Sequence, residues 1–333
     1  MKKNNTIVIA EAGVNHNGRL NLAKKLINEA KKSGADIVKF QTYITDSLVI
    51  KTSKKADYQK KFNPKESQYK MLKNLELSFK DFQILKRLCF KKKIEFLSTG
   101  FDIESIKFLK SINQKRFKIP SGEITNYPLL RFIARYKKEI ILSTGMSNLR
   151  DIENALNVLT KFGTPLKKIT VLHCNSAYPT VPEDVNLKAM TTIKNKFGVD
   201  VGFSDHSIGI EAPIIAVSLG AKIIEKHLTL NKKSIGPDHA ASIEPNQFKD
   251  MVLAIRSVEK YLGNKEKNLT KSESINRDIV RKSIVALKNI AKGEKFSEAN
   301  ITTKRPGNGI SPMNWEKTIG KKAKKNYKKN DLI

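Results

Sequence analysis

The stretch DVGFSDHSIGIEAPIIAVSLGAKIIEKHLT (residues 200–229) contains one complete strand–helix–strand pattern. Two short runs rich in strand-forming residues, Asp200–His206 and Ala221–Thr229, enclose the helical segment Ile208–Leu219. Gly220 follows that segment, at a position where a left-handed turn ends many helices. Two strands joined by one helix predict a parallel pair with a helical crossover, the unit from which α/β folds are built.

The same unit recurs along most of the chain. Amphipathic segments such as Leu20–Ser33, Phe79–Lys93 and Leu149–Phe162 alternate with short β-rich runs. Eight strand–helix units in roughly 260 residues predict a (β/α)8 TIM barrel. The alternative is a doubly wound open sheet, but no GxGxxG motif follows the first run. The predicted strands are Thr6–Ala12, Ala35–Gln41, Ile94–Thr99, Arg116–Ser121, Glu139–Gly145, Ile169–Asn175, Asp200–His206 and Ala221–Thr229.

The composition and the pattern of the sequence change after the helical segment Gln247–Leu262. A polar stretch follows, and beyond it lie short strand-like pieces with turn glycines, Ser283–Leu287 and Asn300–Lys304 among them. We therefore expect three parts: 1–263 as the barrel domain, 264–281 as a linker, and 282–333 as a small β-rich domain.

A long insertion, Thr42–Leu77, follows the second predicted strand. Its composition is polar, so we expect a loop on the face of the barrel formed by the strand C-termini. Long loops inside compact domains are usually functional or disordered. We interpret this one as a lid over an active site.

The charge of the chain is unusual. Among 333 residues, 63 Lys and Arg face 32 Asp and Glu, which gives a formal net charge of +31. Such an excess is compatible with a non-enzymatic nucleic-acid-binding protein. The lysines are scattered over every predicted helix, however, and no known nucleic-acid-binding signature is present. A lysine-rich solvated surface is the better interpretation, with no nucleic-acid partner.

The cysteine content indicates the compartment. Cys89 and Cys174 are too few for a disulfide framework, which favours a reducing environment. The apolar run near the N-terminus, Ile7–Ala10, is too short for a signal sequence, and no stretch has the length of a membrane span. We expect a cytoplasmic protein with no membrane partner.

All five histidines fall within or soon after the ends of predicted strands, where the active sites of TIM barrels lie. His206 and His227 end neighbouring strands and should lie close together. Two imidazoles plus water suit an exchangeable divalent ion acting as a Lewis acid, with Mn²⁺ preferred over Mg²⁺ or Co²⁺. Each histidine taken alone is more often an ordinary core or turn residue. The other three are His16, His173 and His239.

Glu11 ends the first predicted strand, which adjoins the eighth when the barrel closes. Its carboxylate could bind a metal-bound water or a substrate hydroxyl. The alternative is a buried partner for a lysine.

A second group of residues at strand ends favours an anion site. Lys39 and Lys118 would rise from the barrel interior, which is costly unless an anion compensates their charge. Hydroxyls of Ser143 and Ser204 lie at the ends of the fifth and seventh predicted strands. This set predicts a cradle for phosphate and carboxylate groups. The alternative is a structural Lys–Glu network that uses Glu11, Glu123 or Glu225.

With these segments located, the sequence resembles the N-acetylneuraminate (sialic acid) synthase family, which includes the legionaminate and pseudaminate synthases. The tail ITTKRPGNGISP (301–312) is similar to the family's C-terminal antifreeze-like (SAF, β-clip) domain. In order, the motifs that carry the resemblance are EAGVNHNG (11–18), VKFQT (38–42), FKIPSGE (117–123), STGM (143–146), HCNSAYP (173–179), GFSDH (202–206), EKH (225–227) and GPDH (236–239).

The resemblance implies a reaction. Phosphoenolpyruvate and water would condense with N-acetylmannosamine to give sialic acid and phosphate. The alternative is legionaminate synthesis from a 2,4-diacetamido-2,4,6-trideoxyhexose. The resemblance also implies a domain-swapped homodimer, in which the small domain caps the barrel of the partner.

The resemblance assigns roles to individual residues. Glu11 would be catalytic, and His206 and His227 would hold the metal. The phosphoenolpyruvate site would contain Lys39, Thr99, Lys118, Ser121, Ser143, Ser176 and Ser204. The residues facing the N-acyl hexosamine would be Glu11, Glu123, Tyr178, Asp238 and, from the partner subunit, Arg305.

Overall fold

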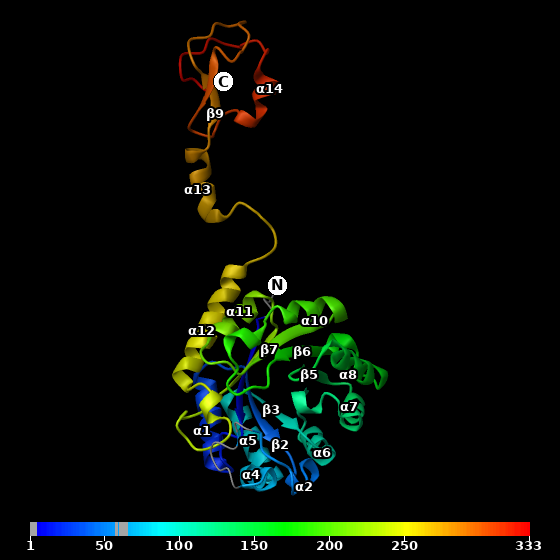
Figure 1. Cartoon of the computed structure of the whole chain (residues 1–333). Coiled ribbons are helices and arrows are strands. Elements are labelled where there is room, and N and C mark those ends of the chain that lie inside the picture. The colour runs from blue at the N-terminus through cyan, green and yellow to red at the C-terminus, as the bar shows by residue number, and fades with distance from the viewer. Residues whose placement is uncertain (1–4, 57–58, 60–65) are drawn as a thin grey trace. The chain divides into compact units, whose positions relative to one another are not determined.

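The computed structural model describes residues 5–56, 59 and 66–333. The chain divides into two compact units, Met1–Gly263 and Asn264–Ile333, which are described separately below (Figure 1).

The first unit is built on a closed barrel of eight parallel strands, which confirms the predicted TIM barrel. Strands β1 and β8 pair in parallel and close it, with Glu11 opposite His227. The strands are β1 (Ile7–Gly13), β2 (Ile37–Thr42), β3 (Glu95–Gly100), β4 (Arg116–Ile119), β5 (Glu139–Ser143), β6 (Ile169–Cys174), β7 (Asp200–Asp205) and β8 (Ile223–His227).

Helices surround the strands (Figure 1). Gly34, Gly163 and Gly220 have positive φ angles after three of them, as the sequence predicted. Among the described residues, none of the helices combines the length and apolar character needed to cross a bilayer. The longer helices are α1 (Leu20–Lys32), α5 (Phe79–Lys92), α6 (Ile103–Ser111), α7 (Tyr127–Ala134), α8 (Leu149–Lys161), α10 (Ala189–Phe197), α11 (Glu211–Ser218) and α12 (Pro245–Leu262). Short elements are α9 (Pro182–Val185), η1 (Ser121–Glu123), η2 (Leu166–Lys168) and η3 (His239–Ala241).

An apolar plug fills the inside of the barrel. It is a separate cluster of buried side chains, distinct from the larger core between the strands and the helices. Because strand side chains alternate, the residue two positions after each member of the plug also points into the barrel. That second layer is polar, and it includes Glu11, Lys39, Thr99, Ser143 and Glu225. The plug consists of Ile9, Ile37, Leu97, Ile141, Leu172 and Ile223.

The insertion after β2 is more ordered than the sequence predicted. It contains the helices α2 (Thr45–Leu48) and α4 (Gln68–Leu75). Met71 and Leu75 of α4 pack into a small buried cluster with Val14 and Tyr43, and this packing stabilises a segment whose composition is polar overall. Part of the predicted lid, 57–58 and 60–65, lies outside the described residues.

The second unit contains a two-stranded antiparallel sheet of β9 (Ser283–Ala286) and β10 (Ile301–Lys304) over its own apolar cluster. The segment expected as a linker includes a helix, α13 (Lys271–Val280). A capping box between Thr270 and Glu273 begins this helix, which explains how it forms although none of its side chains is buried. Two short elements complete the unit, η4 (Pro312–Asn314) and α14 (Trp315–Thr318).

Strands β3 and β4 meet through a single register pair, Thr99 with Lys118. The buried side chain of Gln114 compensates for the missing ladder. Its Oε1 accepts from the backbone N–H of Ser98 at 2.8 Å, and its Nε2 donates to the carbonyls of Ser98 and Arg116 at 3.0 and 2.9 Å. This one amide therefore joins two strands that carry substrate-site candidates.

We predict that Gln114→Leu lowers the free energy of unfolding by about 3 kcal/mol, because three buried backbone groups lose their partners. Urea unfolding measures this change. Gln83→Leu, at an exposed position on α5, is the matched control and should change stability little. Equal effects of the two substitutions would contradict the role given to Gln114.

Candidate active site

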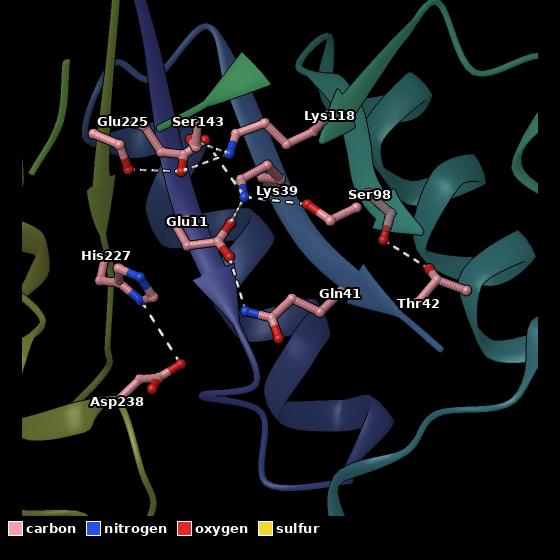
Figure 2. Close-up of polar contacts among 12 residues, drawn as sticks. Glu11, Lys39, Gln41, Thr42, Ser98, Lys118, Ser143, Glu225, His227 and Asp238 are labelled. Carbon is pink, nitrogen blue, oxygen red and sulfur yellow. Dashed lines mark hydrogen bonds and ion pairs between the residues drawn. The ribbon is translucent and has the colours of Figure 1, made fainter. Parts of the chain in front are cut away.

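The polar layer above the plug is centred on two buried lysines (Figure 2). The ammonium group of Lys39 lies 3.1 Å from Glu11 Oε2 and 3.4 Å from Glu225 Oε2, and it donates to Thr99 Oγ1 at 3.3 Å. This lysine, the two glutamates and the threonine come from four different strands. The closed barrel therefore brings together residues that are far apart in the sequence.

Lys118 approaches the same centre from β4. Its ammonium group donates to Ser143 Oγ at 2.6 Å and lies 3.6 Å from Glu225 Oε1. Ser204 also donates to Glu225 Oε1, at 3.0 Å. Glu225 thus links both lysines and a serine that the sequence assigned to one anion site.

The electrostatic environment separates the two glutamates. Burial acts to raise the pKa of Glu225, but Lys118 and Lys39 outweigh it and hold that pKa at about 2. For Glu11, burial dominates over the opposing effect of Lys39 and raises the pKa to about 7. Glu225 is therefore a fixed anion, whereas Glu11 can gain or lose a proton near neutral pH.

The two lysines also differ. Burial alone would lower the pKa of Lys39, but Glu11 and Glu225 outweigh it and raise the pKa. Burial lowers the pKa of Lys118, and its interaction with Glu225 only partly offsets the effect. The Lys–Glu network that was the alternative to an anion cradle is therefore present in this structure. It does not exclude an anion site, because a bound anion could take over part of the carboxylates' role.

His206 and His227 lie together at the C-terminal ends of β7 and β8, with ring centroids 5.3 Å apart. Tyr178 packs against both rings, at 4.1 and 5.8 Å between centroids. The Nδ1 of His206 donates to the carbonyl of Asn175, which leaves its Nε2 as the remaining ligating nitrogen. Burial lowers the pKa of both histidines, so both imidazoles are neutral at pH 7.

This pair fits an exchangeable divalent ion. Neutral imidazoles are metal donors, and the buried Nδ1 of His227 has no hydrogen-bond partner. Among the residues that the structure describes, no group of three or more His, Cys, Asp or Glu side chains could hold a metal. The Nε2 of His206 and the Nδ1 of His227 are the two nitrogens of this pair that a divalent ion could bind.

Ser121 and Ser176 meet at Gly145, just beyond β5. The N–H of Gly145 donates to Ser121 Oγ at 2.9 Å, and a side chain at position 145 would collide with the hydroxyls of both serines. Glycine is required here because the loop backbone approaches two hydroxyl groups so closely.

The residues assigned to the sugar do not all form one cluster with the lysines, and they differ in their burial and surroundings. Asp238 is buried, with an oxygen 3.9 Å from His227 Nδ1, and burial raises its pKa to about 6. Glu123 lies on η1, where it accepts from Asn126 at 2.6 Å. Arg305 belongs to the second unit, directly after β10, and is exposed.

Only two of the five histidines meet, so they do not share one site. His16 is buried against Phe40 on the β1 side. The ring of His173 stacks on Phe203 with Nε2 bonded to the carbonyl of Val185, and His239 is bonded to Thr229. These three histidines contact strand and loop residues around the site and do not contact His206 or His227.

Two members of the cluster were not assigned a functional role by the sequence. Glu225 was expected only as a structural partner, and Gln41 only as part of the motif VKFQT (38–42). Gln41 donates to Glu11 Oε1 at 3.2 Å (Figure 2). The alternation of side chains along a strand could have identified both residues, because each lies two positions after another residue that points into the barrel.

A closed parallel barrel with a charged layer at the strand C-termini and a histidine pair beside it defines a TIM-barrel enzyme. Residues 26–267 match the NeuB family, and residues 281–333 match the SAF domain. The chain therefore belongs to the NeuB family, as its resemblance indicated. It is a phosphoenolpyruvate-dependent, carbon–carbon bond-forming transferase of the sialic-acid-synthase type.

Individual relatives make the family relationship more specific. The chain is 54% identical to N,N'-diacetyllegionaminic acid synthase of Campylobacter jejuni, over 100% of this chain and 99% of the relative. It is 48% identical to the enzyme of that name from Legionella pneumophila, over 96% and 90%. The crystal structure of N-acetylneuraminic acid (sialic acid) synthetase from Leptospira borgpetersenii aligns with a TM-score of 0.72 at 36% identity, over 82% of this chain and 90% of that one.

Proposed function

We propose that the chain is an N,N'-diacetyllegionaminic acid synthase. It would condense phosphoenolpyruvate, water and a 2,4-diacetamido-2,4,6-trideoxyhexose, releasing phosphate. The identity of 54% along the full length of a relative with that name carries this choice of sugar. It favours what the sequence analysis gave as the alternative over the first expectation, N-acetylneuraminate from N-acetylmannosamine.

The lysine pair supports phosphoenolpyruvate as the common substrate. Lys39 and Lys118 are 4% and 2% exposed, above the apolar plug. A substrate with both a phosphate and a carboxylate can use two such ammonium groups at once. We propose that Thr99, Ser121, Ser143, Ser176 and Ser204 complete this site with hydroxyl groups.

The reaction joins C3 of phosphoenolpyruvate to the aldehyde carbon of the open-chain sugar. This leaves cationic character at C2, to which water adds with loss of a proton. The former aldehyde oxygen of the sugar takes up a proton and becomes a hydroxyl. The tetrahedral intermediate then expels phosphate by cleavage of the C2–O bond, and the proton of the C2 hydroxyl leaves with the phosphate as the keto group forms. Lys39 and Lys118 would stabilise the phosphate and carboxylate charges throughout.

Glu11 is the proposed proton carrier. Its pKa of about 7 lets it accept the proton of the attacking water and deliver a proton to the former aldehyde oxygen of the sugar. Gln41 holds its Oε1, so the carboxylate keeps one orientation. Glu225 cannot take this role at neutral pH because the lysines keep its pKa at about 2.

His206 and His227 would hold a divalent ion, Mn²⁺ in the first instance, with Mg²⁺ or Co²⁺ as alternatives. Such an ion supplies Lewis-acid polarisation of the sugar's aldehyde oxygen. The chain's own contribution is to keep both imidazoles neutral and to fix His206 through its bond to Asn175.

We propose that Glu123, Tyr178 and Asp238 face the sugar. In a domain-swapped homodimer, Arg305 of the partner subunit would add a guanidinium suited to an amide carbonyl. A cytoplasmic location is proposed because both cysteines are free and buried.

The substrate assignment is tested by incubating the chain with phosphoenolpyruvate, Mn²⁺ and each candidate sugar, and identifying the products by mass. We predict the nine-carbon acid from the diacetamido sugar, with a kcat/KM at least about tenfold above that for N-acetylmannosamine. A site that bonds the second acetamido group would leave its polar groups unpaired with a sugar that lacks this group. A preference for N-acetylmannosamine would return the function to sialic acid synthesis. Absence of condensation with both sugars would contradict the proposed activity.

We predict that Lys118→Met raises the KM for phosphoenolpyruvate much more than the KM for the sugar. Removing one charge-assisted contact to a buried anion should cost about 2–3 kcal/mol. Steady-state kinetics with each substrate varied in turn measure this split. Lys107→Met, on the exposed face of α6, is the control. An unchanged KM for phosphoenolpyruvate would leave Lys118 as a structural partner of Glu225 only.

The proposed swap is tested by mixing Arg305→Ala chains with His206→Ala chains, each inactive alone. A heterodimer would contain one complete site, formed by the barrel of the first chain and Arg305 of the second. We predict that activity returns on subunit exchange, as measured by phosphate release. If exchange is confirmed by mass and no activity returns, Arg305 does not act across an interface.

A further inference from the structure

A fully buried ion pair lies beside the two histidines. Lys226 and Asp205 are register partners on β8 and β7, and neither side chain is exposed. The ammonium group of Lys226 contacts Asp205 Oδ2 and also donates to the carbonyl of Ser207. Each member of the pair directly precedes one of the histidines in the sequence.

This pair does not belong to the cluster inside the barrel. Ser204 and Glu225, the preceding register partners, bond to each other on the face that carries Lys39 and Lys118. Strand side chains alternate, so Asp205 and Lys226 point to the opposite face. The reaction proposed above therefore uses neither of them.

The contacts of the pair enclose His206. Asp205 Oδ1 accepts from the backbone N–H of Ser207 at 2.8 Å and from its hydroxyl at 2.7 Å. Lys226 contacts the residues on both sides of His206, while the N–H of Thr180 donates to the carbonyl of His206 itself at 3.0 Å. The bend 205–207 is thus bonded to β8 at the residue before His227.

Stability alone does not account for an ion pair at this place. Removing two charges from water is expensive, and an apolar pair of similar volume is often as stable or more stable. A buried ammonium with defined acceptors differs from an apolar contact in its directionality, because it is satisfied in only one arrangement of the groups around it. Contacts of this kind restrict how the ends of β7 and β8 lie relative to each other.

We propose that Asp205 and Lys226 are positioning residues that hold His206 and His227 at the spacing needed to share one divalent ion. This inference rests on the metal site of the proposed function. Because the pair joins the residues immediately before the two histidines, a shift of one strand end against the other would break it.

The test uses the double variant Asp205→Leu/Lys226→Met, which removes both charges and leaves none unpaired. Mn²⁺ alone is titrated into the folded, full-length protein and followed by electron paramagnetic resonance, and thermal unfolding is recorded in parallel. We predict that the Mn²⁺ dissociation constant rises about tenfold or more, as for other residues that orient metal ligands. The unfolding midpoint should fall as well, because the N–H, the hydroxyl and the carbonyl of Ser207 lose the partners that Asp205 and Lys226 supply, so the Mn²⁺ affinity is the measurement that decides.

Arg116→Met is the matched control. It removes another cross-strand ion pair of the same barrel, between Arg116 and Glu95, where β4 and β3 begin. We expect this variant to lose stability and to bind Mn²⁺ as the unsubstituted chain does. A purely structural role for Asp205 and Lys226 would give the double variant the same pattern as this control.

Wild-type Mn²⁺ affinity in the folded double variant would overturn the proposal. If that variant does not fold, Asp205→Asn, which keeps an acceptor for Ser207 but loses the ion pair, must weaken Mn²⁺ binding, and unchanged affinity there has the same meaning. His206→Ala in the same titration separates the two levels of the argument. The metal assignment itself fails if the His206→Ala variant binds Mn²⁺ as tightly as the unsubstituted protein does. It also fails if the unsubstituted protein binds no Mn²⁺.

Discussion

The structure depends on holding two ammonium groups inside a barrel whose lower part is closed by an apolar plug. Lys39 and Lys118 are almost completely buried above that plug, so each needs an anionic partner within the protein when no substrate is bound. Glu11 and Glu225 supply that charge from the neighbouring strands β1 and β8. The ion pairs of the polar layer and the shifted pKa values of its carboxylates follow from this requirement.

The two carboxylates have different consequences for binding an anion. Glu225 stays ionised between the lysines, and its ion pairs with Lys39 and Lys118 hold both side chains in place without a substrate. Glu11 has a pKa of about 7, and a proton taken up there would remove a negative charge from the site at little cost. An incoming phosphoenolpyruvate would therefore meet two lysines that are already in place. Glu11, which competes with it for Lys39, can be neutralised by one proton.

Much of this arrangement could be predicted from the sequence, because period-two alternation and strand order are local and topological properties. They identified the eight strands and placed His206 beside His227. Features that depend on specific tertiary contacts could not be predicted: the bridge made by Gln114, the packing of α4 through Met71, and the separation of His16 from the histidine pair. The choice between the two sugars could not be made from the motifs either, because each of them is shared by the synthases of both acids in the resemblance; the 54% identity to a legionaminic acid synthase favours the diacetamido sugar.

The central claim is that the lysine pair receives the anionic substrate. A crystal structure of the chain soaked with phosphoenolpyruvate tests it most directly. The account predicts phosphate and carboxylate oxygens within hydrogen-bond distance of Lys39 Nζ and Lys118 Nζ, with Glu225 still in contact with Lys118. Phosphoenolpyruvate bound elsewhere, with both lysines paired only to Glu11 and Glu225 as they are now, would contradict it.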